Sequence, residues 1–148
     1  MIEIGPVTEY DVEVAEAMGK LRQQLSARHD GSAISRELIE EIIESPYHDI
    51  LIATDDDKVV GMTIVSIVMA TLDRNVYMED LVVDAECRGK GVGGLLLDAV
   101  KDWGRAHGCR RLEFTSSSRE KKEGAKGFYE SHGAEVRETN VFRAELND

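Results

Sequence analysis

The sequence has few residues from which a metal site or a disulfide framework is built. Its 148 residues include only two cysteines, Cys87 and Cys109, and their spacing suits neither a metal-ligand pair nor a set of disulfides. The four histidines are scattered without ligand spacing. We therefore expect no metal, and we interpret both cysteines as thiols in a reducing cytoplasm.

Long apolar runs and an excess of basic charge are also absent. No apolar stretch approaches the roughly 20 residues that a membrane helix needs. Residues 1–4 show no basic segment followed by an apolar one, so no membrane contact and no signal peptide are expected. The 18 basic and 29 acidic side chains give a formal net charge of −11. Because nucleic-acid binding needs Lys and Arg to neutralise phosphates, no nucleic-acid partner is expected. The balance favours a solvated acidic surface and suits cationic partners.

The hydrophobic fraction of 42% is enough for a self-sufficient core in a chain of this length. We find no repeat or linker, so a single domain over residues 1–148 is expected. The spacing of apolar residues predicts the order β-α-α-β-β-β-α-β-α-β-β. This order predicts a mixed α/β (α+β) sheet with helices on both faces, in which a right-handed crossover joins two parallel strands.

Local signals set the expected bounds. Thr8 is the expected cap of a helix that runs to about Ala27, and Ser35 is the expected cap of a second helix that ends at Ser45. Strands are expected at 2–4, 49–54, 58–69, 76–84 and 110–115, and a third helix at 92–107. A last helix from about 118 to 132 is followed by two short strands, near Glu135 and over 141–146.

The most informative segment joins the strand that ends at residue 84 to the helix that starts at residue 92. It consists of Arg88, Gly89, Lys90, Gly91, Val92, Gly93 and Gly94. Glycines at such a joint let the backbone approach a ligand closely. Free N–H groups at the helix start, together with the helix dipole and two cationic side chains, favour a polyanion. The segment therefore predicts a pyrophosphate site.

Two known phosphate-binding patterns are alternatives for this segment. Gly89, Gly91 and Gly94 satisfy the dinucleotide pattern G-x-G-x-x-G, and Glu113 lies at about the distance downstream where a ribose ligand is expected. A dinucleotide fold, however, places this pattern in its first βαβ unit and continues with further parallel strands. The predicted antiparallel hairpins before the segment disfavour that reading. The Walker pattern is absent.

Three segments together resemble the GNAT family of N-acetyltransferases. Residues 88–93 match the family signature R-x-x-G-x-G, and residues 77–83 resemble its central strand. Ala125, Phe128, Tyr129 and Gly133 resemble its A-x-x-F-Y-x-x-x-G segment. The resemblance runs from about Asp49 to the C-terminus, and its motifs are most similar to those of the diamine acetyltransferase-like branch.

The resemblance implies a GNAT-like fold whose central strand splays apart from its neighbour, so that acetyl-CoA lies in the gap. By position, Leu81, Val82 and Val83 would contact the pantetheine arm, and the Val82 N–H would polarise the thioester carbonyl. Residues 88–94 would hold the pyrophosphate. The family often has an Asn near the start of the last helix, where this chain has 118–122, and an aromatic residue where it has Ala134.

Two side chains are candidates for proton transfer. Glu79 is the candidate base, acting directly or through water, because period-two alternation would place it on one strand face with Leu81 and Val83. Apolar surroundings would then raise its proton affinity. Tyr129 is the candidate acid for the leaving thiolate, on its family position, and Asp80 is the weaker candidate base.

These observations predict an enzyme that moves an acetyl group from acetyl-CoA to a primary amine of a small cationic acceptor by direct attack. The alternative from another class is a CoA-binding sensor or regulatory module without catalysis. A dinucleotide oxidoreductase is the third reading. The resemblance also allows a homodimer.

Overall fold

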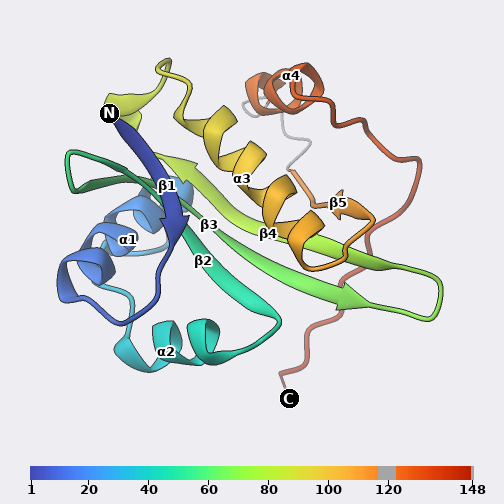
Figure 1. The fold of residues 1–148 in the computed structure, drawn as a ribbon, viewed down its shortest axis with the longest axis horizontal. Helices are drawn as coiled ribbons and strands as arrows, with labels where there is room; N and C mark the ends of the chain where they lie inside the picture. Colours follow the sequence, from blue (N-terminus) through green and yellow to red (C-terminus); the bar gives the residue numbers. More distant parts are fainter. Residues whose placement is uncertain (117–122, 148) are drawn as a thin grey trace. The chain divides into compact units, whose positions relative to one another are not determined.

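The computed structural model describes residues 1–116 and 123–147, and the chain divides into two compact units, Met1–Thr115 and Ser116–Asp148. Each unit is described by itself. The elements in chain order are β1 (Ile2–Pro6), α1 (Val12–Leu25), α2 (Arg36–Glu44), β2 (His48–Asp55), β3 (Lys58–Met69), β4 (Arg74–Val83), the 3-10 turn η1 (Ala85–Cys87), α3 (Val92–Ala106), β5 (Arg111–Glu113) and α4 (Glu123–Ser131) (Figure 1).

The five strands form one mixed sheet in the first unit, with the spatial order β1-β2-β3-β4-β5. The first four strands pair antiparallel, and β4 and β5 pair parallel. The β2–β3 hairpin turns through Asp56 and Asp57, whose φ values of 49° and 69° are both positive. Such values match the right-handed twist of the flanking strands. The predicted mixed sheet is confirmed.

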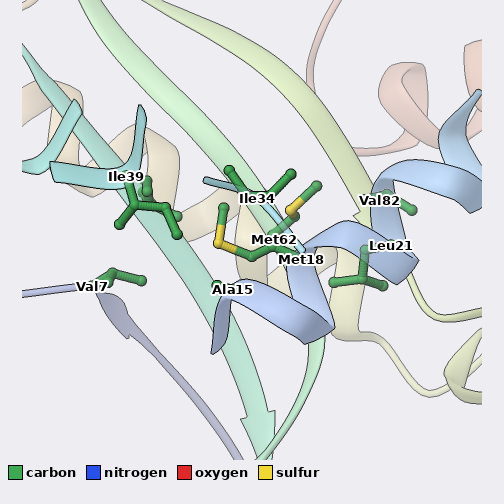
Figure 2. Packing of buried hydrophobic residues seen from close by; sticks show 9 residues of the cluster. Val7, Ala15, Met18, Leu21, Ile34, Ile39, Met62 and Val82 are labelled. Carbon is green, nitrogen blue, oxygen red and sulfur yellow. The ribbon is translucent and has the colours of Figure 1, made fainter. Parts of the chain in front are cut away.

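Helices cover both faces of this sheet, as predicted. On one face, α1 and α2 pack on a buried cluster that includes Met62 of β3 and Val82 of β4. Figure 2 shows these side chains beside those of α1. On the other face, a Cβ built on Gly61 would lie 3.0 Å from Leu96 of α3. Because neighbouring strand residues point to opposite faces, α3 packs on the face away from α1.

The first helix begins later than the sequence predicted. Its cap is Asp11, whose Oδ1 accepts the N–H groups of Glu13 (2.8 Å) and Val14 (3.1 Å), so Thr8 is not the cap. Val7 still donates its N–H to Ile50 O (2.9 Å), which keeps this part of the chain bonded to the sheet. An Asp at this place also complements the helix dipole. Ser35 caps α2 as predicted.

The two strands predicted after the last helix are not formed, because residues 134–147 contain no strand. The apolar side chains that suggested them are exposed, among them Phe142 at 89% and Leu146 at 95%. Alternation describes a strand's faces, but a strand also needs a hydrogen-bonding neighbour. The predicted start of the last helix, 118–122, lies outside the described residues. No helix in the described ranges has the length and apolarity to cross a membrane.

Candidate functional site

The central strand β4 loses its neighbour halfway along its length. Strand β5 has only three residues, and it pairs with β4 only at Asn75, Val76 and Tyr77. Within the described ranges, no strand pairs with the β5-facing edge of 78–83. An unpaired edge of this kind presents backbone N–H and C=O groups to an extended ligand. The structure therefore leaves 78–83 unpaired along the edge where the resemblance places the gap.

The ladder to β3 determines which peptide groups face this gap. Asp84 donates its N–H to Val60 O at 2.8 Å. Hydrogen-bonded and non-bonded pairs alternate along an antiparallel ladder, so the Val82 N–H points at β3 and the peptide groups of Val83 point at the open edge. The expected contact of the Val82 N–H with a thioester is therefore not supported. The Val83 carbonyl accepts from Arg88 Nε at 3.2 Å, which leaves the Val83 N–H for a ligand.

The loop between η1 and α3 is open to solvent and shaped by two left-handed glycines. Gly89 and Gly91 both have φ of 82°, and Gly91 is the cap residue of α3. Residues with a Cβ rarely adopt such values. A Cβ built on either glycine would have no atom within 4 Å, so these positions are kept small by backbone conformation and face open space.

Six consecutive backbone N–H groups in this loop lack a protein acceptor. In the described part of the chain, none of the N–H groups of 89–94 donates to a protein atom, and the first that does is that of Leu95, to Gly91 O at 3.1 Å. Side chains cap α1 and α2, whereas α3 has no side-chain cap. A helix start left in this state is a ready anion site.

Charge and burial support the same interpretation. Arg88 and Lys90 are exposed, and the first turn of α3 contains no acidic residue, unlike the first turns of α1 and α2. The Val92 side chain is 1% exposed and belongs to the core, so this residue offers a ligand only its N–H.

The ladder between β3 and β4 contains a β-bulge beside the gap. Ile64 pairs with Glu79, and Met62 pairs with Val82. One residue of β3 therefore lies opposite two residues of β4. An extra residue of this kind bends the bulged strand and increases its twist.

The bulge changes which side chains share a face. Asp80 in the bulge has φ of 55°, a left-handed conformation that Asp tolerates better than most residues. Beyond it the alternation shifts by one residue, so Glu79 shares its face with Val82 rather than with Leu81 and Val83. The period-two prediction was wrong at this point. The signal was present in the sequence, because two polar residues followed by three apolar ones break the alternation.

Glu79 itself is exposed. The expectation that apolar surroundings enclose its carboxylate is therefore wrong, although the buried residues Met62 and Val82 lie on the same face of the sheet. Its backbone carbonyl accepts a hydrogen bond from Thr63 Oγ1 at 2.9 Å, which fixes the strand at this residue. An exposed carboxylate at the edge of a gap is accessible to both water and an acceptor.

Tyr129 lies on α4 in the second unit. Its ring packs edge to face on Phe128 with 5.3 Å between the ring centroids, and its carbonyl accepts the N–H groups of His132 and Ala134. Burial raises the pKa of the Tyr129 phenol above its usual value near 10. A phenol in this environment stays protonated at neutral pH.

The remaining reactive side chains do not gather into a site. Burial raises the pKa of the Cys109 thiol, which disfavours its reactive thiolate. Cys87 lies in η1, away from Cys109 in sequence, and both are free thiols. Among the described residues, no group of three or more His, Cys, Asp or Glu side chains is arranged to hold a metal ion.

The chain belongs to the acetyltransferase (GNAT) family, whose model matches residues 16–134. Solved structures with the same fold include glucosamine-6-phosphate N-acetyltransferase from Arabidopsis thaliana, with 21% identity, coverage of 97% of this chain and 98% of that chain, and a TM-score of 0.78.

Two further solved structures share the fold, the first of them an aminoglycoside acetyltransferase. One is meta-AAC0020 from an uncultured soil metagenomic sample, in complex with sisomicin, with 17% identity, coverage of 99% and 97%, and a TM-score of 0.84. The other is AAC(6')-Iy in complex with the bisubstrate analogue CoA-S-monomethyl-acetylneamine, with 23% identity, coverage of 99% of both chains, and a TM-score of 0.77.

These findings exclude the dinucleotide reading of the glycine-rich segment. The family match identifies an acetyltransferase, and the sheet contains one parallel pair rather than the succession that a dinucleotide fold requires. The dinucleotide reading is therefore wrong. Glu113, its expected ribose ligand, accepts a hydrogen bond from Asn75 Nδ2 at 2.9 Å instead.

Proposed function

We propose that this chain transfers the acetyl group of acetyl-CoA to a primary amine of a small cationic acceptor, by direct attack while both are bound. The observation that carries the proposal is the run of six free N–H groups at 89–94, directly after the unpaired edge of β4. A diphosphate fits the first feature and an extended amide-containing arm fits the second.

The residues present fit coenzyme A, which supplies the activated acetyl group when it is bound. The N–H groups of 89–94 and the cations of Arg88 and Lys90 would hold its diphosphate. The N–H of Val83 would donate a hydrogen bond to its pantetheine arm. Leu81 and Val82, which precede Val83 in β4, would lie beside this arm.

The chemistry requires that the acceptor amine lose a proton, because a lysine-like amine has a pKa of about 10. Glu79 would take this proton through water, since its carboxylate is exposed at the bulge. Tyr129 would supply a proton to the departing thiolate, and its raised pKa keeps that proton in place at neutral pH.

Charge and similarity support a cationic acceptor. The chain carries a formal net charge of −11, and Glu79 and Asp80 are two exposed acidic neighbours at the bulge. Solved structures with this fold are named for enzymes of amino sugars and aminoglycosides, which are amine acceptors. The motif similarity to diamine acetyltransferases favours a polyamine-like acceptor within this class.

A thiol-release assay with acetyl-CoA and a panel of polyamines, aminoglycosides and amino sugars tests the proposal. We expect acceptor-dependent release of CoA. A melting scan tests binding separately, because a ligand at about 100 times its dissociation constant adds roughly 2.7 kcal/mol. For a domain of this size that means a shift of roughly 5–10 °C. Stabilisation by CoA without turnover on any amine would favour the sensor module instead.

Replacing the candidate base gives a sharper test. We expect Glu79→Gln to lower kcat/KM for the amine by about tenfold at neutral pH. This is less than the roughly hundredfold or more that is typical of acid–base catalysis, because solvent bases reach an exposed site. The affinity for acetyl-CoA should not change. Steady-state kinetics against both substrates measure the two effects.

The neighbouring carboxylate provides the matched control. Asp80→Asn removes a charge next to Glu79 and retains a side chain that tolerates a left-handed backbone. We expect a smaller loss for this variant. A larger loss for Asp80→Asn would transfer the base role to Asp80. The cytoplasmic location and the homodimer stay predictions, and sedimentation of the purified protein tests the dimer.

A further inference from the structure

One buried hydroxyl lies inside the otherwise apolar sheet. Thr63, in the middle of β3, is 0% exposed and is the polar residue among the buried side chains of the described ranges. Its Oγ1 donates to the Glu79 carbonyl of β4 at 2.9 Å. Burying a hydroxyl is costly unless it is hydrogen-bonded, and a valine of the same shape would suit an apolar sheet. Packing alone therefore does not explain why position 63 has a hydroxyl group.

Thr63 lies opposite the bulge. Met62 and Ile64, the residues on either side of it, pair with Val82 and Glu79. Thr63 is therefore the single β3 residue opposite the two bulge residues of β4, Asp80 and Leu81. Its hydrogen bond joins the carbonyl directly before Asp80, the residue with φ of 55°. A non-glycine residue in this conformation persists only where its surroundings hold it.

The bulge also lies where β4 leaves its neighbour. Pairing with β5 ends at Tyr77, and the bulge begins three residues later, at Asp80. Because a bulge bends its strand, the bend at Asp80 sets the direction in which 81–83 continue beyond the last residue that pairs with β5. The Val83 N–H and the acidic side chain of Glu79 both take their positions from this bend.

We propose that Thr63 is a positioning residue for coenzyme A, which acts by holding the bulge through the Glu79 carbonyl. The inference rests on the proposed function, since it assumes that the open edge of β4 binds the pantetheine arm. Thr63 touches no reacting group in this account. Its hydroxyl secures the strained residue that opens the gap, and its loss lets 79–83 relax away from the binding geometry.

The test compares the dissociation constants of CoA, measured by calorimetry, for four variants and the wild type. Thr63→Val removes the hydroxyl and keeps the shape, whereas Thr63→Ser keeps the hydroxyl. Thr54→Val on β2 is the matched control, because it makes the same substitution in the same sheet, at the register shift between β2 and β3 and away from the bulge of β4. Thr63→Val with Asp80→Gly adds a residue that adopts positive φ without strain.

We expect Thr63→Val to raise the dissociation constant about fivefold, the effect of one hydrogen bond. Thr63→Ser and the double variant should restore affinity, while Thr54→Val should match the wild type. The rescue by Asp80→Gly is the informative readout, because a merely stabilising role of Thr63 would not respond to it.

Equal affinity of Thr63→Val and the wild type would overturn the inference, and so would a double variant that remains as weak as Thr63→Val. A wild-type chain that binds no CoA would overturn the proposed function together with this inference. A wild-type chain that binds CoA, with a variant result that contradicts the expectation, would overturn this inference alone. If Thr63→Val does not fold, Asp80→Val tests the bulge from the other strand. Weaker CoA binding by that variant supports the inference, and unchanged binding overturns it.

Discussion

Gly91→Val is expected to lower the affinity for acetyl-CoA by roughly a hundredfold. Gly91 has φ of 82°, and a β-branched residue is a severe outlier there. The loop must relax, which redirects the N–H groups of 89–94. Loss of two hydrogen bonds to a charged group, at about 1.5 kcal/mol each, gives roughly that factor. Isothermal titration calorimetry with acetyl-CoA measures it.

Gly5→Val is the matched control for this variant. A Cβ at Gly5 also has no atom within 4 Å, but Gly5 lies in β1 without a positive φ. Valine suits a strand, so the control should bind acetyl-CoA like the wild type. Wild-type affinity in Gly91→Val would show that the loop does not hold the diphosphate, and the proposed function would lose its main support.

Tyr129→Phe should lower turnover by at least about tenfold and leave acetyl-CoA affinity nearly unchanged, since general acid catalysis typically contributes about a hundred- to ten-thousandfold. The substitution removes only the hydroxyl and keeps the ring that packs on Phe128. Steady-state kcat and calorimetry with acetyl-CoA separate the two quantities. An unchanged kcat would reject the role of Tyr129.

The pH profile gives a second readout for the same residue. The acid role requires the protonated phenol, and burial raises the pKa of Tyr129, so wild-type kcat should hold to a higher pH than an ordinary tyrosine would allow. The decline of kcat at alkaline pH that results from ionisation of the Tyr129 phenol should be absent in Tyr129→Phe. Tyr47→Phe, at an exposed tyrosine of the first unit, is the control and should keep both kcat and the decline.

Most of the fold was predictable because its signals are local. The strand at Lys58–Met69 and the helix cap at Ser35 were predicted as the structure has them. The cap at Asp11 was missed because Thr8 is also a good cap by type, and the two are distinguished by the hydrogen bonds that Asp11 accepts in the structure. The strands after α4 were predicted wrongly because alternation does not supply a pairing partner.

The same distinction between local signals and strand pairing applies to the candidate site. Sequence alone indicated the conformation and charge of the loop at 88–94, since glycines and cations at a strand-to-helix joint favour an open, positively charged backbone turn. Only the tertiary structure decided how β4 presents its edge. The bulge at Asp80, the bond from Thr63 and the early end of β5 arise from pairing between different strands. Strand register is a property of two segments together, so the residues of one strand cannot specify it.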